Sequence, residues 1–319
     1  MAQRFRLIFL VSFESLGVHN LQTPPRVRAC GPADPGPMGH VPEDLAAGTG
    51  PSGHVPQAIP APGFRPLVAG RPAMGKSALA LQMAADIAKQ GIPVGYISLE
   101  MPAKDLATRF LARAARVDQG KLLLGKVTPD EVAKVERVKG AGSIPLAVSA
   151  PIDSTFAGVL AQMTSLRRRH GAQVVVIDYL GLVSEASGRN ESRQDVIARM
   201  SRALKQYALR HEAVVIVVSQ LNRALAGRAD KRPQMTDLRE SGSLEQDSDI
   251  IIMVHRPDVY DPEDRVGEAE LIVEKSRLGT TGIADVVFQG AYGAFVPMAR
   301  TPEPQRSAAG YGGVRDGAW

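Results

Sequence analysis

Cysteine is nearly absent from this chain, because Cys30 is the single cysteine among its 319 residues. One thiol excludes an internal disulfide framework and a cysteine-based metal cluster, and it suits a reducing compartment. Long apolar runs are missing as well. No segment is long enough to cross a bilayer, and the apolar stretch 7–13 is too short for a secretory signal peptide. We therefore expect a cytoplasmic protein with no membrane partner.

Aromatic residues are also scarce, at 5% of the chain with one tryptophan. They form no run of the kind on which single-stranded bases stack. The net charge of +5 and the pI of about 9.4 are compatible with a polyanionic partner but do not by themselves indicate one. Hydrophobic residues make up 44% of the chain, which is enough for one large core or two smaller ones.

Proline and glycine are concentrated near the amino terminus, and residues 24–66 hold eleven of the 23 prolines. Proline lacks a backbone N–H and fixes φ, so this segment sustains neither helix nor sheet. We expect residues 1–63 to be a disordered Pro/Gly-rich leader. Residues 64–300 are expected to form the folded domain, and residues 301–319 a flexible tail.

From residue 64 onward, short apolar runs alternate with amphipathic stretches. The expected strands are 67–69, 94–99, 146–149, 174–178 and 214–219. The expected helices are 78–89, 104–116, 129–139, 156–170 and 192–211. This alternation predicts an α/β fold with a mainly parallel sheet flanked by helices. Further runs without helices between them predict an antiparallel C-terminal extension of the sheet, at 250–255, 269–275, 284–288 and 294–296.

The most informative stretch lies between the first expected strand and the first expected helix. Its residues are Gly70, Arg71, Pro72, Ala73, Met74, Gly75, Lys76 and Ser77. Two glycines, a lysine and a hydroxyl at this spacing are typical of a phosphate-binding P-loop. Backbone N–H groups at the helix N-terminus would bind the phosphates, Lys76 would reach the outer phosphates and Ser77 would hold Mg²⁺. The sequence therefore predicts a nucleoside triphosphate site.

Polar residues follow three of the expected strands, at the edge where parallel sheets bind their ligands. Asp178 ends one strand and would hold Mg²⁺ through water, although it could also cap a loop. Glu100 ends another, and it is either the base that deprotonates an attacking water or a solvated surface residue. Gln220 would sense the γ-phosphate or orient water. The residue types alone leave these alternatives open.

Longer motifs occur at residues 98–101, 176–180, 219–223, 231–233 and 237–247, with the sequences SLEM, VIDYL, SQLNR, KRP and DLRESGSLEQD. In type, order and spacing they resemble the motor domain of the bacterial and phage DnaB replicative helicases, from about residue 67 to residue 296. The resemblance implies a RecA-like P-loop NTPase core that uses ATP and Mg²⁺. It also implies a homo-hexameric helicase that moves 5′ to 3′ on single-stranded DNA, with primase and a helicase loader as further partners.

The resemblance assigns roles to residues around the nucleotide. Lys76 and Ser77 would bind the phosphates and Mg²⁺, and Asp178 would be the Mg²⁺-associated carboxylate. Glu100 would be the catalytic base. Gln220 would be the γ-phosphate sensor.

The resemblance also assigns residues to neighbouring molecules. Lys275 and Arg277 match a Lys-x-Arg motif that completes the nucleotide site of an adjacent subunit, where a guanidinium neutralises transition-state charge. Arg239, Glu240 and Gly242 match a loop that grips the backbone of single-stranded DNA. Arginine pairs with phosphate, and glycine lets a backbone N–H approach it.

The chain departs from the family pattern before the P-loop. Family members carry an N-terminal collar domain and a linker helix, and residues 1–63 resemble neither. Ring assembly, primase contact and adenine packing therefore stay open. Two other functions compete with the helicase: a RecA-like filament-forming ATPase, and an inactive nucleotide-binding fragment. The motif 237–247 favours the helicase over the first, and the full set of hydrolytic residues argues against the second.

Overall fold

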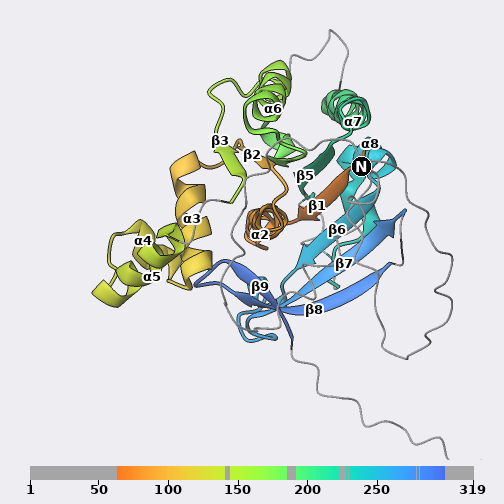
Figure 1. Cartoon of the computed structure of the whole chain (residues 1–319). Helices are drawn as coiled ribbons and strands as arrows, with labels where there is room; N and C mark the ends of the chain where they lie inside the picture. Colours follow the sequence, from red (N-terminus) through yellow and green to blue (C-terminus); the bar gives the residue numbers. More distant parts are fainter. Residues whose placement is uncertain are drawn as a thin grey trace, which may run out of the picture.

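The fold is a mixed sheet with helices on both faces (Figure 1). The computed structural model describes residues 63–140, 144–184, 192–222, 228, 230–277, 279 and 281–298, without the side chains of 239–241. The expected leader and tail lie outside the described residues, apart from Gly63. Within the described ranges, no helix combines the length and the apolar character needed to cross a membrane.

The nine strands of the sheet are ordered β3-β2-β4-β5-β1-β6-β7-β8-β9. Their bounds are β1 Pro66–Gly70, β2 Val94–Ser98, β3 Leu146–Ser149, β4 Val174–Asp178, β5 Val214–Gln220, β6 Ile250–His255, β7 Glu268–Ser276, β8 Gly282–Gln289 and β9 Ala294–Pro297. Pairing is parallel from β3 through β6 and antiparallel from β6 through β9. The predicted parallel sheet with an antiparallel extension is confirmed.

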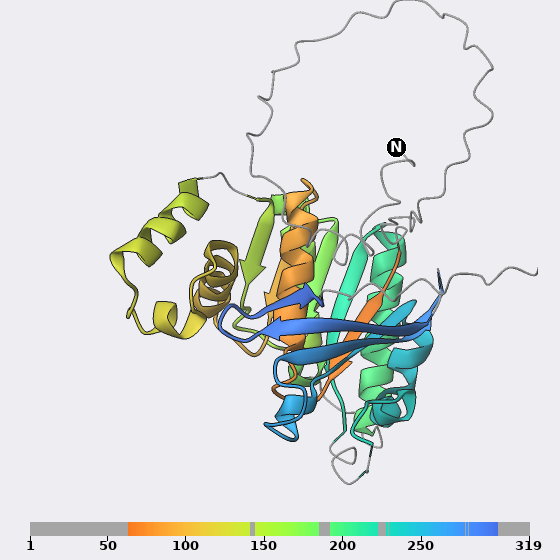
Figure 2. The same ribbon diagram turned by 90° about the horizontal axis from the view of Figure 1, so that it is seen from below.

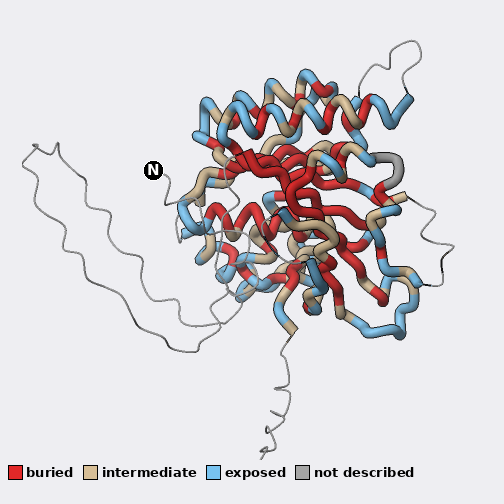
Figure 3. Tube along the Cα trace, turned by 90° about the vertical axis from the view of Figure 1, so that its right-hand side faces the viewer, coloured by how far each residue is buried: buried red, intermediate tan, exposed pale blue. Residues whose placement is uncertain are grey.

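Helices cover the two faces of the sheet unequally. Their bounds are α2 Lys76–Lys89, α3 Ala103–Ala115, α4 Gln119–Leu123, α5 Pro129–Gly140, α6 Phe156–His170, α7 Arg193–Arg210 and α8 Gly242–Asp247. In the core, α2 packs on one face, and α6, α7 and α8 pack on the other. Alternate residues of the central strands enter the two cores, so both faces of the strands are buried (Figure 3). This explains their continuous apolar runs.

The antiparallel extension returns across α2 (Figure 2). Gln82 of α2 is buried and forms two hydrogen bonds with the backbone of Phe295 in β9. Its Nε2 donates to the carbonyl at 2.9 Å, and its Oε1 accepts from the backbone N–H at 2.9 Å. The buried Phe295 ring joins the core on this face of the sheet. These contacts hold the C-terminal strands against the helix that begins at the P-loop.

The elements that sequence analysis missed are short. They are α4, α8 and the 3₁₀ helices η2 Leu180–Leu182, η4 Met235–Ser241 and η5 Pro257–Val259. The helix α4 buries none of its residues, and Leu244 is the one buried residue of α8. Such segments are too short to show the 3.6-residue period on which a helix prediction depends.

One arginine of the 231–233 motif serves the fold. Arg232 donates two hydrogen bonds of 2.7 Å to the carboxylate of Glu270, a residue of β7 that is 2% exposed. Arg265 donates a third at 2.6 Å. The hydrogen bonds from Arg232 lower the pKa of Glu270 to about 2, against the opposing effect of its burial. The carboxylate is therefore ionised and multiply bonded at the start of β7.

We expect Glu270→Gln to lower the free energy of unfolding at pH 7 by about 1–3 kcal/mol, because charge-assisted hydrogen bonds are lost. Since the folded-state pKa lies below the ordinary value of 4.5, the stabilisation is fully present above that value and is lost as pH falls toward 2. Urea unfolding of the native protein and of Glu270→Gln should therefore show a difference in the free energy of unfolding at pH 7 that becomes smaller below pH 4.5.

The matched control is Glu263→Gln, which makes the same substitution at an exposed residue before β7. It should change the free energy of unfolding by less than about 0.5 kcal/mol. If the native protein and Glu270→Gln differ in free energy of unfolding by the same amount at every pH, the ion-pair explanation is contradicted.

Candidate active site

The P-loop joins the central strand β1 to α2, and its two glycines stand where side chains do not fit. A Cβ on Gly70 would lie 3.0 Å from the carbonyl oxygen of Val254. Gly75 has a φ of 94° directly before the helix, and its Cβ would lie 2.9 Å from the Phe295 ring. A left-handed conformation favours glycine. The backbone can therefore turn tightly and present the N–H groups of the α2 N-terminus, where anions bind.

Lys76 lies across this loop. Its Nζ donates to the carbonyl of Arg71 at 2.7 Å. Burial lowers its pKa to about 8, while the negative charges of Asp178 and Glu100 oppose the shift. The ammonium is thus within electrostatic reach of both predicted carboxylates.

Asp178 lies at the end of β4 and is 1% exposed. The Tyr96 hydroxyl donates to its Oδ2 at 2.7 Å, whereas its Oδ1 is buried without a full hydrogen bond from the described residues. Burial raises the pKa of Asp178, and the Tyr96 and Ser77 hydroxyls oppose this shift. A buried, unpaired carboxylate oxygen near a serine hydroxyl fits Mg²⁺, which prefers hard oxygen ligands.

Glu100 and Gln220 lie with the P-loop around one cavity of about 560 Å³. Both side chains are exposed, Glu100 just beyond β2 and Gln220 at the end of β5. Register explains their proximity, because Gly70 pairs with Gln220, and Ser98 pairs with Asp178. The structure thus brings the predicted residues Lys76, Ser77, Glu100 and Gln220 together around the cavity, and Asp178 is buried beside it.

The far side of this cavity was not anticipated from the sequence. The C-terminal hairpin lines it with Phe288 and Tyr292. The guanidinium of Arg256 lies 4.3 Å from the centre of the Phe288 ring, and the Phe288 and Phe295 rings are 4.7 Å apart. These aromatic residues lie about 200 positions after the P-loop, and no local pattern connects the two. This wall can hold a flat, apolar group.

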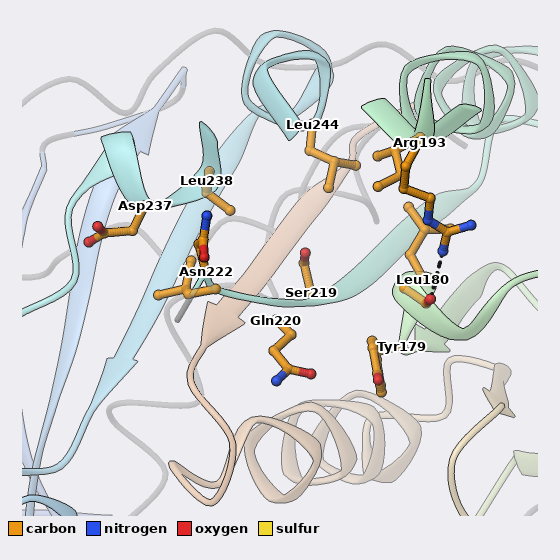
Figure 4. Close-up of a pocket in the computed structure, with 12 residues that line it drawn as sticks. Tyr179, Leu180, Arg193, Ser219, Gln220, Asn222, Asp237, Leu238 and Leu244 are labelled. Atoms are coloured by element: carbon orange, nitrogen blue, oxygen red, sulfur yellow. Dashed lines mark hydrogen bonds between the residues drawn. The ribbon is translucent and has the colours of Figure 1, made fainter. Parts of the chain in front are cut away.

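A second cavity of about 400 Å³ lies beside the first, between β5, α7 and α8 (Figure 4). Ser219, Asn222 and Asp237 contribute polar groups to its wall. Tyr179 and Gln220 line both cavities. These two side chains therefore form a shared wall between the P-loop side and the side of η4 and α8.

The predicted DNA-contacting residues come directly after Asp237 and Leu238, which line the second cavity. Sequence analysis expected a loop at 239–242, whereas the backbone forms η4 up to Ser241 and α8 from Gly242. The side chains of Arg239 and Glu240 lie outside the described residues. Gly242 is exposed, and its Cβ position meets open space. The backbone at Gly242 is therefore accessible to a ligand.

Lys275 and Arg277 lie at the opposite edge of the sheet. Because β7 is antiparallel to β6, its end reaches the amino ends of β1 and β6. Lys275 donates to the carbonyl of Glu245 at 2.7 Å. Arg277, with 53% of its side chain exposed, donates to Oδ1 of Asp249 at 2.9 Å. Neither is among the described residues that line the two cavities.

Asp249 holds several elements together at this edge, and sequence analysis missed it. Besides Arg277, its carboxylate accepts from the backbone N–H of Arg65 at 2.8 Å and from Nζ of Lys205 at 2.6 Å. Asp249 is 4% exposed. A buried carboxylate with this many donors fixes the base of β1 and orients the Arg277 guanidinium.

Most of the chain matches a known protein family. The family described as DnaB-like helicase C terminal domain matches residues 63–297. The chain is 41% identical over 241 residues to a replicative DNA helicase DnaB of Leifsonia xyli subsp. xyli, covering 75% of this chain and 52% of the relative. It is 36% identical over 240 residues to one of Geobacillus stearothermophilus, covering 73% and 52%. The chain therefore spans about half the length of these relatives.

Solved structures give the same result. One of them, described as an ATPase domain, is 34% identical, with a TM-score of 0.69, over 74% of this chain and 84% of that one. A DnaB-like replicative helicase described with its interactions with primase is 33% identical, with a TM-score of 0.69, over 75% and 58%. The RecA-like core predicted from the sequence is confirmed.

Proposed function

Because this chain belongs to the DnaB-like helicase C-terminal domain family, we propose that it is the ATP-hydrolysing motor of a replicative DNA helicase. One observation carries the proposal. The P-loop, the Glu100 carboxylate and the Gln220 amide surround one cavity, with the buried Asp178 carboxylate beside it. Within one subunit, these groups would serve as a phosphate cradle, a base, a hydrogen-bond donor to the γ-phosphate and a metal-associated acid, which are the groups that phosphoanhydride hydrolysis uses.

In this proposal, the triphosphate binds to the N-terminus of α2 and to Lys76. Ser77 and Asp178 would hold Mg²⁺, which neutralises charge on the phosphate oxygens. The adenine ring would pack in the aromatic end of the cavity, beside Phe288 and Tyr292. The adenine packing that the sequence left open would thus come from the C-terminal hairpin.

Hydrolysis needs a water aligned with the γ-phosphate and a base that takes its proton. Glu100 lies on the rim of the cavity and would accept that proton on its carboxylate. The Gln220 side-chain amide would hydrogen-bond the γ-phosphate or the water. Since Gln220 also lines the second cavity, loss of the γ-phosphate would change a wall that faces η4 and α8.

Arg277 would act on the nucleotide of a neighbouring subunit, with Lys275 beside it. The five residues of β1 span about 16 Å, and Arg277 lies at the edge opposite the P-loop. Its guanidinium therefore cannot reach its own cavity, but a head-to-tail ring would bring it to the next one. We propose a homo-hexamer in the cytoplasm, with primase and a helicase loader as partners.

Single-stranded DNA would bind at Arg239, Glu240 and Gly242. An arginine and an accessible backbone suit phosphate contacts without base readout. These positions span the end of η4 and the start of α8, next to the second cavity. Bound DNA and the γ-phosphate would then lie on opposite sides of the wall formed by Tyr179 and Gln220.

We expect Glu100→Gln to keep ATP binding but to lower turnover by about 10²–10⁴-fold, because the variant keeps the side-chain shape and loses the proton acceptor. Turnover is measured with and without single-stranded DNA, and binding with a fluorescent ATP analogue. The matched control, Asp105→Asn, removes another carboxylate from the same cavity and should retain turnover. Normal hydrolysis by Glu100→Gln would remove Glu100 from the base role. Failure of DNA to stimulate the native protein would argue against a helicase.

Action across a subunit boundary is tested by mixing two inactive variants. Arg277→Ala should bind ATP and lose about 10³-fold in turnover, the range of arginine fingers. Lys76→Ala should lose nucleotide binding. A mixed assembly forms some sites with an intact P-loop and an intact Arg277, so ATPase activity should return. Arg168→Ala, on the exposed face of α6, is the control that should remain active. Hetero-oligomers without restored activity would show that Arg277 does not act in trans.

A further inference from the structure

Tyr96 places a hydroxyl in the apolar core directly beside the predicted magnesium site. It lies in the middle of β2 and is fully buried on the face packed against α2. In the β2–β4 register, Tyr96 is opposite Val176, and Asp178 is two residues further along β4. A diagonal neighbour at this offset is within reach of a long aromatic side chain. The Tyr96 hydroxyl reaches it, donating to Oδ2 of Asp178 at 2.7 Å.

The apolar core alone does not require this hydroxyl. Other members of the core on this face, such as Val68, Met83 and Ile216, are apolar and offer the hydroxyl no hydrogen-bond partner. Burying a hydroxyl is unfavourable unless it forms a hydrogen bond, and here it bonds to an ionisable acid, which strengthens the bond. The tyrosine is therefore explained by Asp178 rather than by packing.

The two oxygens of Asp178 have different surroundings as a result. Oδ2 is occupied by Tyr96, whereas Oδ1 is buried and lacks a full hydrogen bond from the described residues. The other hydroxyl that acts on this carboxylate belongs to Ser77 at the start of α2. A single donor on one oxygen fixes the rotation of the carboxylate and leaves the second oxygen available.

We propose that Tyr96 is a positioning residue that holds Asp178 with Oδ1 available to the magnesium–nucleotide complex. The inference rests on the proposed function, because it assumes that Asp178 and Ser77 serve Mg²⁺. Outer-shell hydrogen bonds of this kind orient metal-associated carboxylates and change metal affinity. Without the hydroxyl, the Asp178 side chain can rotate toward other donors, including the Lys76 ammonium that already attracts it.

The test is Tyr96→Phe, which removes one oxygen atom and keeps the ring. Affinity for a fluorescent ADP is measured against Mg²⁺ concentration and again in excess EDTA. We expect the Mg²⁺ concentration for half-maximal enhancement of binding to rise about 10–100-fold, the usual effect of an outer-shell substitution. Binding in EDTA should remain unchanged, because the P-loop and Lys76 are intact. General damage to the fold would weaken binding under both conditions.

A double-mutant cycle sharpens the test. Asp178→Asn should itself remove the Mg²⁺ enhancement, and adding Tyr96→Phe to it should have no further effect. Tyr207→Phe is the matched control, since it deletes a hydroxyl from a buried tyrosine in the core on the other face of the sheet. It should bind ADP and Mg²⁺ as the native protein does.

The outcomes separate the inference from the function on which it rests. Three results would overturn the role of Tyr96 and leave the proposed function intact. They are an unchanged Mg²⁺ requirement in Tyr96→Phe, an equal loss of ADP affinity with and without Mg²⁺, and an additive effect in the Asp178→Asn background. Failure of the native protein to bind ADP in a Mg²⁺-dependent way would overturn both the inference and the proposed function.

Discussion

Backbone hydrogen bonding between parallel strands sets Gly70 opposite Gln220 and Ser98 opposite Asp178. Because strand side chains alternate between faces, a slip of one residue would turn these terminal groups to the other side of the sheet. The register is secured from the opposite edge. There Asp249, just before β6, accepts the backbone N–H of Arg65, just before β1, and donates its own N–H to the Arg65 carbonyl at 3.0 Å. The position of the P-loop relative to β6 depends on this pairing.

Buried polar groups are few in this core, and they lie where strands or helices must be held in one arrangement. Arg65 is fully buried and donates to the carbonyls of Leu244 and Asp247, and its burial lowers its pKa to about 10. It thereby ties β1 to the end of α8. Ionic groups like these carry a desolvation cost, so their value lies more in specifying one geometry than in adding stability.

The segment from η4 to Asp249 connects the two edges of the sheet. At its start, Asp237 and Leu238 line the second cavity, next to Gln220. At its end, Asp249 bonds Arg277. In the proposed ring, one short segment would therefore contact DNA, border the γ-phosphate sensor and orient the group offered to the next subunit.

The sequence was enough to predict the strand pattern, the antiparallel extension and the P-loop, and it placed Glu100, Asp178 and Gln220 at strand ends. These features follow from local spacing, apolar periodicity and the rule that parallel strands end at one edge. The short helices α4 and α8 carried too little periodic signal to be predicted. The roles of Arg239, Lys275 and Arg277 rested on resemblance, and they remain proposals.

The contacts between residues far apart in the chain could not be predicted in this way. Tyr96 meets Asp178 across 82 residues, Arg65 meets Asp249 across 184, and Gln82 meets Phe295 across 213. The aromatic wall of the nucleotide cavity and the wall shared with the second cavity have the same origin. A local pattern reports a residue's own backbone and its near neighbours, whereas these contacts depend on strand order and register, which are set by the packing of the whole sheet.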